Sequence, residues 1–205
     1  MKFSRTVLGA AVAIASLASL SANAQTFQLN VPSGAVYGTV TLSQVDSDTV
    51  HVFVDLADGY NFVDTGSHNT FGFNAGLNAS ITGIGPGSAY SATGSFSQSG
   101  FGTFQYGIAC SSPTCQGGNN STTPNDQLSF DVNRAGITGA DFVANNAGFT
   151  FTADLFGPNP TGGSQTFPVG STTPVTAVPE PETYALMLAG LGVVGFMARR
   201  RKQQA

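Results

Sequence analysis

The chain has 205 residues with a formal net charge of −4, and only 9% of its residues are charged. These values exclude a disordered polyelectrolyte and a basic nucleic-acid binder. Residues 25–178 contain nine aspartates, no glutamate and one arginine, Arg134, so this stretch alone carries a charge of −8. Such a body repels DNA, RNA and anionic lipid, and we expect no nucleic-acid partner.

The N-terminal segment, residues 1–24, has the layout of a secretory signal peptide. It combines a basic start, an apolar stretch over residues 7–20, and a small-residue cleavage site with Ala22 and Ala24. An uncleaved membrane anchor is the alternative, but about 14 apolar residues are fewer than the roughly 20 that span a bilayer. We therefore expect export, cleavage after Ala24, and a mature chain that begins at Gln25.

The body, residues 25–157, shows apolar residues that alternate with polar ones at a period of two. This alternation predicts strands with one buried and one solvated face, and the short strands and Gly-rich turns favour an all-β fold. We predict a single antiparallel β-sandwich, jelly-roll-like, between the signal peptide and a C-terminal membrane-spanning helix. The residues expected to share strand faces are Phe27, Leu29 and Val31; Val36, Val40 and Leu42; Val50, Val52, Val54 and Leu56; Phe104, Tyr106 and Ile108; Leu128, Phe130 and Val132; and Phe149, Phe151, Ala153 and Leu155.

Less regular stretches interrupt this pattern. The glycine-rich residues 74–102 are expected to hold strands around Ile81 to Ile84 and around residues 91–98, with uncertain boundaries. A helical turn is expected near residues 139–145. Residues 158–178 are rich in Pro, Gly and Thr and predict a linker, with Thr166 to Val169 as an alternative last edge strand.

The C-terminal stretch 183–198 contains sixteen uncharged, mostly apolar residues. At 1.5 Å per residue it covers roughly 24 Å, which can just cross a membrane when flanking side chains extend it. A buried core helix is the alternative, but a charged run at the chain end leaves it nothing to pack against. The basic cluster predicts a cytoplasmic tail by the positive-inside rule, and its members are Arg199, Arg200, Arg201 and Lys202.

Directly before this helix stand Pro179, Glu180 and Pro181. The two prolines hold the backbone extended and exclude this segment from a helix or a central strand. The order of Pro-Glu-Pro, short apolar helix, arginine cluster and chain end, over residues 179–205, resembles the PEP-CTERM sorting signal of Gram-negative bacteria.

The resemblance implies that an exosortase, a membrane-embedded enzyme, recognises the Pro-Glu-Pro motif and removes the helix. It also implies transient anchoring in the inner membrane before release to the cell surface or extracellular matrix. The body is similar to those of such proteins only in composition, so the resemblance transfers no catalytic residue to it.

Cys110 and Cys115 are the two cysteines of the chain. In an exported protein with an even cysteine count, a disulfide that closes this short loop is the expected state. Free thiols are a second interpretation. A metal or redox site is a third, although no histidine or further cysteine is near in sequence to complete a set of about four ligands.

Catalytic chemistry finds little support in the sequence. His51 and His68 are expected on a strand and in a loop, and the Gly-x-Ser-x-Gly elbow of a Ser-His-Asp hydrolase is absent. A glycosidase needs two paired carboxylic acids, for which loop aspartates such as Asp64 are candidates. We therefore predict a protein that is not an enzyme, and we keep an Asp-based hydrolase as the least favoured alternative.

Two binding functions remain open for the body. Loop aspartates supply the hard oxygen ligands that Ca²⁺ takes, although their spacing matches no EF-hand, and no cofactor is otherwise expected. The nearest candidates for such a site are Asp46, Asp48, Asp55 and Asp58. Exposed aromatic side chains would suit a sugar-stacking platform, for which the candidates are Tyr37, Tyr60 and Tyr90.

The sequence therefore predicts a non-enzymatic exported protein of the cell surface or the exopolysaccharide matrix, sorted through its C-terminus. A carbohydrate-binding, lectin-like module of a biofilm matrix is the alternative. The expected partners are an exosortase-type enzyme and, for the alternative, exopolysaccharide.

Overall fold

The computed structural model describes residues 24–66, 68–87, 89–110, 125–159, 162–172, 174–175 and 190–191. The predicted signal peptide up to residue 23, Cys115, the Pro-Glu-Pro motif and the basic cluster lie outside these ranges, as does the predicted membrane helix except for two residues. Within the described ranges, no helix has the length and apolar character needed to cross a membrane.

Sheet A contains six strands in the order β14-β1-β2-β3-β11-β6, and every neighbouring pair is antiparallel. Its strands alternate buried and solvated residues as the sequence predicts, most regularly in β3. The bounds are β1 (Gln25–Leu29), β2 (Gly38–Asp46), β3 (Thr49–Leu56), β6 (Ser80–Gly85), β11 (Gln127–Asn133) and β14 (Pro174–Val175).

Sheet B has the order β13-β12-β5-β10-β7, with the short β4 paired to β12. The bounds are β4 (Asn61–Phe62), β5 (Phe71–Phe73), β7 (Tyr90–Thr93), β10 (Tyr106–Cys110), β12 (Phe151–Pro158) and β13 (Ser164–Ser171). The strands β8 (Phe96–Gln98) and β9 (Gly102–Phe104) form a separate hairpin. One 3-10 helix, η1 (Gly139–Asp141), stands where the sequence predicts a helical turn.

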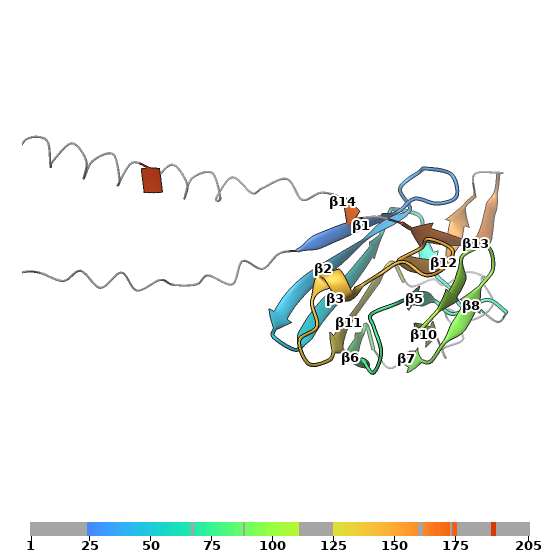
Figure 1. The fold of residues 1–205 in the computed structure, drawn as a ribbon. Helices are drawn as coiled ribbons and strands as arrows, with labels where there is room; N and C mark the ends of the chain where they lie inside the picture. The colour runs from blue at the N-terminus through green and yellow to red at the C-terminus, as the bar shows by residue number, and fades with distance from the viewer. Residues whose placement is uncertain are drawn as a thin grey trace, which may run out of the picture.

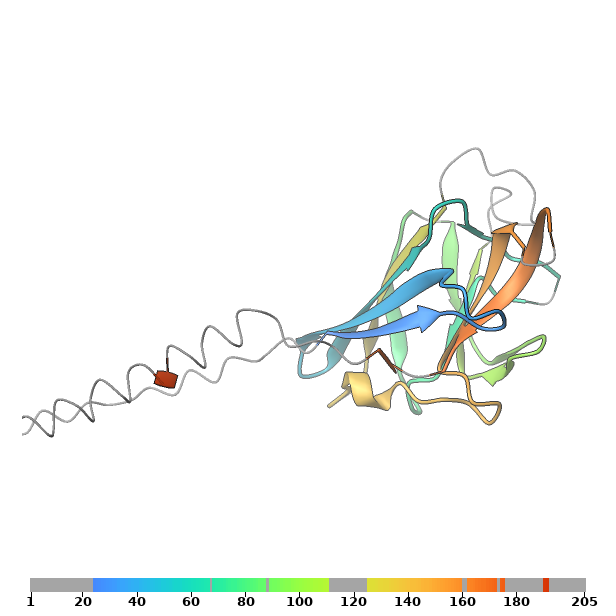
Figure 2. The ribbon, with the colours of Figure 1, turned by 90° about the horizontal axis from the view of Figure 1, so that it is seen from above.

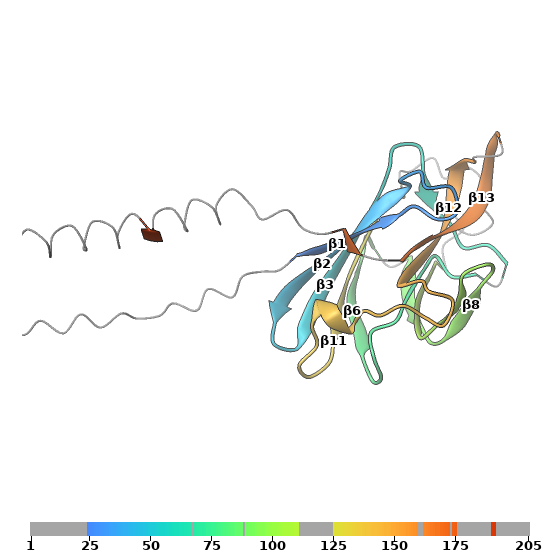
Figure 3. The same cartoon turned by 45° about the horizontal axis from the view of Figure 1, so that its top comes forward.

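The two sheets pack face to face around one core (Figure 1). The ring of Phe71 in β5 lies 5.9 Å from that of Phe130 in β11, and Phe27 of β1 lies 4.8 Å from Phe151 of β12. Figure 3 shows β1, β2, β3, β6 and β11 gathered on one side and β12 and β13 on the other. The antiparallel all-β prediction is confirmed, and this packing fits the predicted sandwich.

The strand order does not fit the jelly-roll-like part of the prediction. Three consecutive strands, β1, β2 and β3, are neighbours in sheet A, and β14 returns to lie beside β1. Consecutive strands of a jelly roll mostly alternate between its two sheets. Here β1, β2 and β3 form a meander within one sheet, and β14 pairs with β1 in a Greek-key arrangement. Turn lengths between strands determine this connectivity, and the alternation of side chains does not encode it.

Most of the expected core residues are fully buried, including Val52, Val54, Leu128 and Phe130. The prediction that Phe149 shares the buried face of β12 is wrong, because Phe149 precedes this strand and is only partly buried. The Gly148 amide donates to the Asn145 carbonyl in a turn that directs Phe149 away from the line of β12. The ring of Phe149 packs on that of Phe101, with 4.8 Å between the ring centroids. Val36 also leaves its predicted strand face and is exposed.

The predicted linker over residues 158–178 is wrong for much of its length. β13 (Ser164–Ser171) pairs with β12 along its whole extent, and Val169 is fully buried. The alternative last strand is therefore confirmed and is longer than expected. Pro168 is tolerated because β13 is an edge strand, where a missing amide donor costs no ladder hydrogen bond.

The outer face of sheet B is covered by the β8–β9 hairpin. Gly72 of β5 and Gly107 of β10 lie directly opposite each other, and the ring of Phe96 occupies the space over Gly72 and reaches that over Gly107, which Asn69 and Thr93 also fill. A Cβ at Gly72 would lie 2.4 Å from the tip of that ring. The glycine pair therefore lets an aromatic side chain cover sheet B from outside.

The two ends of the body meet at the edge of sheet A. Thr26 of β1 pairs with Val175 of β14, and Phe27 pairs with Pro174. The helix η1, yellow in Figure 2, lies next to the same corner, and a Cβ on its Gly139 would lie 2.8 Å from the Gln25 side-chain oxygen. Both termini therefore leave the body at one point.

Candidate functional site

The sorting motif itself lies outside the described residues, but the body ends close to it. Val175 is the last described residue of the body, and only residues 176–178 separate it from Pro179. Because β14 pairs with β1, the Pro-Glu-Pro motif follows a strand of the fold instead of a long linker. This short spacing is the part of the sorting site that the structure defines.

Cys110 is disulfide-bonded at the end of β10. Its backbone amide donates to the Asp64 carboxylate at 2.9 Å, which fixes the strand end. Its predicted partner, Cys115, lies outside the described residues, and the pairing therefore stays a prediction.

Three of the four aspartates considered for Ca²⁺ accept hydrogen bonds from the protein itself, and the fourth, Asp58, is exposed in a turn. Asp46 Oδ1 accepts the Asp48 amide at 2.8 Å, Asp48 Oδ1 accepts the Gly136 amide at 2.9 Å, and Asp55 Oδ1 accepts from the Gln127 side chain at 3.0 Å. Among residues that the structure describes, no three acidic, histidine or cysteine side chains are placed to hold a metal ion. The Ca²⁺ alternative therefore gains no support from this part of the chain.

A buried acidic cluster lies where the loop after β4 meets β12. Asp154 is only 1% exposed, and its carboxylate accepts the Thr65 amide at 3.0 Å and also the Thr65 hydroxyl. His68 Nδ1 lies 3.8 Å from Asp154 Oδ2, without a hydrogen-bond partner. The sequence did not single out Asp154, because Thr65 and Asp154 stand 89 positions apart.

Burial raises the pKa of both aspartates near this cluster, Asp154 and Asp64. Burial raises the pKa of Asp154 above its ordinary value, against the opposing effects of the Thr65 hydroxyl and of His68. Burial also raises the pKa of Asp64, opposed by the bond from the Cys110 amide and by His68. The side chain of Asp154 is closed to solvent and already bonded, so a substrate has no access to it.

The solvent side of sheet A carries a second candidate site. Thr41, Phe53 and Ser129 lie directly opposite one another on β2, β3 and β11, and all three are partly solvent-exposed. We call the surrounding surface the outer polar face. Its members are Thr39, Thr41, Ser43, His51, Phe53, Asp55, Gln127, Ser129 and Asp131.

The polar residues of this face are ordered in pairs on either side of Phe53. His51 Nδ1 lies 2.7 Å from Asp131 Oδ1, and Gln127 Nε2 donates to Asp55 Oδ1 at 3.0 Å. Phe53 therefore presents an aromatic ring between a histidine–aspartate pair and an amide–carboxylate pair. The signal was present in the sequence, where Phe53 occupies the polar side of an alternating strand.

The tyrosines predicted for a sugar platform do not form one. Tyr37 is 1% and Tyr90 7% exposed, and both belong to the core. Burial raises the pKa of Tyr90 to about 12, against the opposing effect of its hydrogen bond to the Asn125 side chain. Tyr60 packs edge-on against Tyr37 at 5.4 Å, and its hydroxyl donates to the Pro158 carbonyl. These side chains fill one end of the sandwich.

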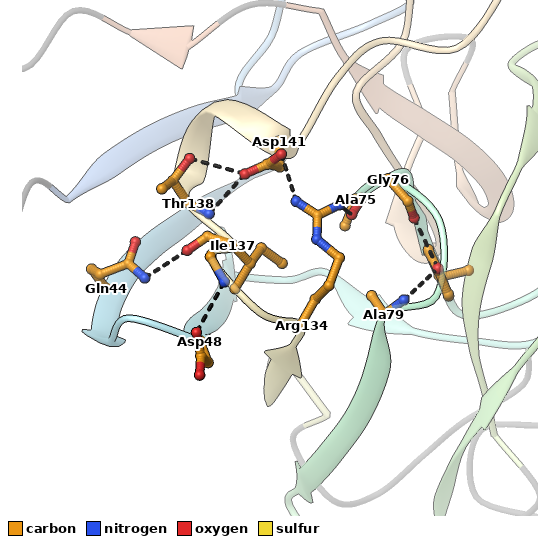
Figure 4. A network of polar contacts seen from close by, with 11 residues as sticks. Gln44, Asp48, Ala75, Gly76, Ala79, Arg134, Ile137, Thr138 and Asp141 are labelled. Carbon is orange, nitrogen blue, oxygen red and sulfur yellow. Dashed lines mark hydrogen bonds and ion pairs between the residues drawn. The ribbon is translucent and has the colours of Figure 1, made fainter.

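Arg134, the only arginine of the body, is committed to a structural network (Figure 4). Its guanidinium lies 2.6 Å from the Asp141 carboxylate and donates to the Ala75 carbonyl at 2.9 Å. The Thr138 amide first, and Arg134 next, lower the pKa of Asp141. The network holds the loop after β11 against the loop after β5, and it leaves no free cation for an anionic ligand at this place.

An apolar cavity of about 410 Å³ opens beside β13. Its lining includes Pro32, Phe101, Phe149, Phe167 and Pro168, and none of its lining residues is acidic, basic or a histidine. It therefore offers no acid, base or charged nucleophile to a substrate, and neither aspartate of the buried cluster reaches it.

Comparison with known proteins bears on the C-terminus. Neither a curated protein nor a solved structure matches the chain. One family model does match, the PEP-CTERM protein-sorting motif, and it covers residues 177–202. These residues contain the Pro-Glu-Pro motif, the apolar stretch and the basic cluster in the predicted order. The chain thus carries a PEP-CTERM protein-sorting motif, which implies an exported protein that passes the membrane and is processed by an exosortase.

Proposed function

We propose that the chain is a non-enzymatic protein of the cell surface or the exopolysaccharide matrix, delivered there after a signal peptide and its sorting helix have been removed. The sorting motif carries this proposal. The body supports it in one further way: β1 begins at Gln25, the residue at which the predicted mature chain starts. The first strand of the body therefore starts where the mature chain is predicted to start.

The geometry of the polar groups supports the non-enzymatic part. Asp64 lies close enough to Asp154 to affect its pKa, but Asp154 is enclosed and bonded to Thr65. The cavity beside β13 lacks titratable side chains. General acid–base chemistry needs a positioned proton donor or acceptor that a substrate can reach, and neither of these two places provides one. The exposed His51–Asp131 pair belongs to the outer polar face and does not line this cavity.

A localisation experiment tests this proposal. Cells that express the full chain are separated into inner-membrane, periplasmic, surface and matrix fractions, and the body is detected in each. We expect the mature body in the surface and matrix fractions. A body that stays in the inner membrane with its C-terminus intact would contradict the proposal.

The outer polar face favours a second function, the binding of a neutral polysaccharide. Aromatic rings stack on the apolar faces of sugar rings, and the flanking amide, carboxylate and hydroxyl groups suit sugar hydroxyls. Phe53 has this setting between the Asp55–Gln127 and His51–Asp131 pairs. The aspartates and the acidic body disfavour an acidic polysaccharide.

Affinity electrophoresis of the mature body, residues 25–178, separates these functions. Gels that contain hydroxyethyl cellulose, which is neutral, should retard the body, whereas gels with alginate, which is acidic, should not. Phe53→Ala should remove the retardation, while Leu77→Ala, which truncates an exposed apolar side chain elsewhere, should preserve it. Equal mobility with and without hydroxyethyl cellulose would leave the sorted surface protein as the function and reject the lectin-like one.

A further inference from the structure

The last strand of the body lies only a few residues before the sorting motif. Val175 is anchored by its pairing with Thr26, and its Cα is four residues before that of Pro179. At no more than about 3.6 Å per residue, the motif can lie at most about 14 Å from this anchor. While β14 stays paired, the edge of sheet A must therefore stand beside any enzyme that holds Pro179.

β14 is built to leave the sheet easily. It has two residues, it lies at the edge of sheet A, and Pro174 has no amide hydrogen to donate. The next anchor toward the N-terminus is stronger: the Thr150 hydroxyl donates to the Thr172 carbonyl at 3.0 Å, directly after the long strand β13. Local opening that stops at Thr172 undoes the two pairings of β14 with β1, and Pro174 is already exposed in the folded state.

Release of β14 lengthens the reach of the motif. With Thr172 as the last anchor, seven residues lead to Pro179, and the extended chain spans about 25 Å. Enzymes that bind a peptide in extended form contact several residues on each side of the reacting bond. A folded edge within 14 Å of the motif occupies the space that such a binding groove needs.

We propose that the processing enzyme takes up the chain from residue 173 onward as one extended peptide, and that β14 leaves β1 when it does. Pairing of β14 with β1 then slows processing, and the low stability of this pairing determines how fast the body is released. This inference rests on exosortase processing of the motif, and it adds that the folded body takes part in the rate.

The test links β14 covalently to β1 and then restores the reach of the motif by an insertion. We call the disulfide-linked variant the locked chain. Thr26→Cys with Val175→Cys places two cysteines at directly opposite positions, where an inter-strand disulfide can form in an oxidising compartment. A second chain carries the same pair and six additional Gly/Ser residues between Val175 and Thr176. A third carries the insertion alone, and Thr26→Cys alone is the control. Processing of each full chain is followed by pulse-chase and mass in cells with the enzyme.

We expect the locked chain to be processed at least tenfold more slowly than the parent, and the locked chain with the insertion at the parent's rate. The insertion alone should raise the initial rate severalfold, because it supplies reach without opening β14. A locked chain that is processed at the parent's rate, or a slow chain that the insertion does not rescue, overturns the inference while leaving exosortase processing intact. A parent that is never processed overturns both.

Discussion

Arg134 offers a sharp test of how the body is held together. Replacing it by Met keeps an unbranched apolar stem while removing the guanidinium (Figure 4). The variant loses the ion pair to Asp141 and the hydrogen bond to the Ala75 carbonyl. Ala75 is fully buried, so its carbonyl is left without this donor in a place that water reaches poorly.

The magnitude follows from these two contacts. Arg134 and Asp141 are about a quarter and a third exposed, so solvent screening limits the ion pair to about 0.5–1 kcal/mol. A hydrogen bond from a charged donor to a carbonyl contributes about 1.5–3 kcal/mol. We expect Arg134→Met to lower the free energy of unfolding by about 2–4 kcal/mol at pH 7.

The pH dependence identifies the ion pair. The pKa of Asp141 is lower in the folded protein, so its contribution is present above the unfolded value of 3.8 and is lost as the pH falls through the folded value. The cost of Arg134→Met should therefore decrease by about 0.5–1 kcal/mol at strongly acidic pH, where only the bond to Ala75 remains to be lost.

Urea unfolding of the mature body and of the variant at neutral and strongly acidic pH measures both quantities. The double variant Arg134→Met/Asp141→Asn closes a thermodynamic cycle that isolates the pair. A cost below about 0.5 kcal/mol at neutral pH, or one that grows in acid, would refute this account of the network.

Three further changes test other parts of the fold. The raised pKa of Asp154 means that its charged form is unfavourable in the folded state, so the parent should lose stability as the pH rises above 3.8. Asp154→Asn should reduce this loss. A urea series from pH 4 to 8 in which the variant keeps the parent's slope would contradict this. Asp154→Ala should cost about 1–3 kcal/mol in the same assay, because the Thr65 amide loses its acceptor. Gly72→Ala should cost about 1–3 kcal/mol by displacing Phe96, and Phe96→Ala in the same chain should recover part of it, whereas additive losses would mean that the two residues do not touch.

The strands could be predicted where one face is buried and the other is wet. β3 is the clearest example, since Val50, Val52 and Val54 are buried and the residues between them are not. β12 also alternates apolar and polar residues, and its strand was predicted, but the residues from Phe151 to Leu155 are all buried. The sequence pattern places the polar Asp154 on a solvated face, so alternation alone could not predict that Asp154 is buried.

The connections were harder to predict than the strands. β13 contains Pro168 and few large apolar residues, so its composition resembles a linker, and only its pairing with β12 makes it a strand. The sorting motif was the opposite case. The motif is defined by residue types and their order along the chain, so Pro179, Glu180 and Pro181 could be recognised without a fold, and the family match confirms the motif.

The most direct test of the sorting account is the intact mass of the exported protein and of a variant with Pro179→Ala and Pro181→Ala. The parent should lack the apolar stretch and the basic cluster that follow the motif. The variant should retain them and stay with the inner membrane, while its body unfolds at the parent's urea concentration, because β1 to β14 end before the motif. A proline variant that is shortened and released like the parent would contradict the claim that this motif is what the processing enzyme reads.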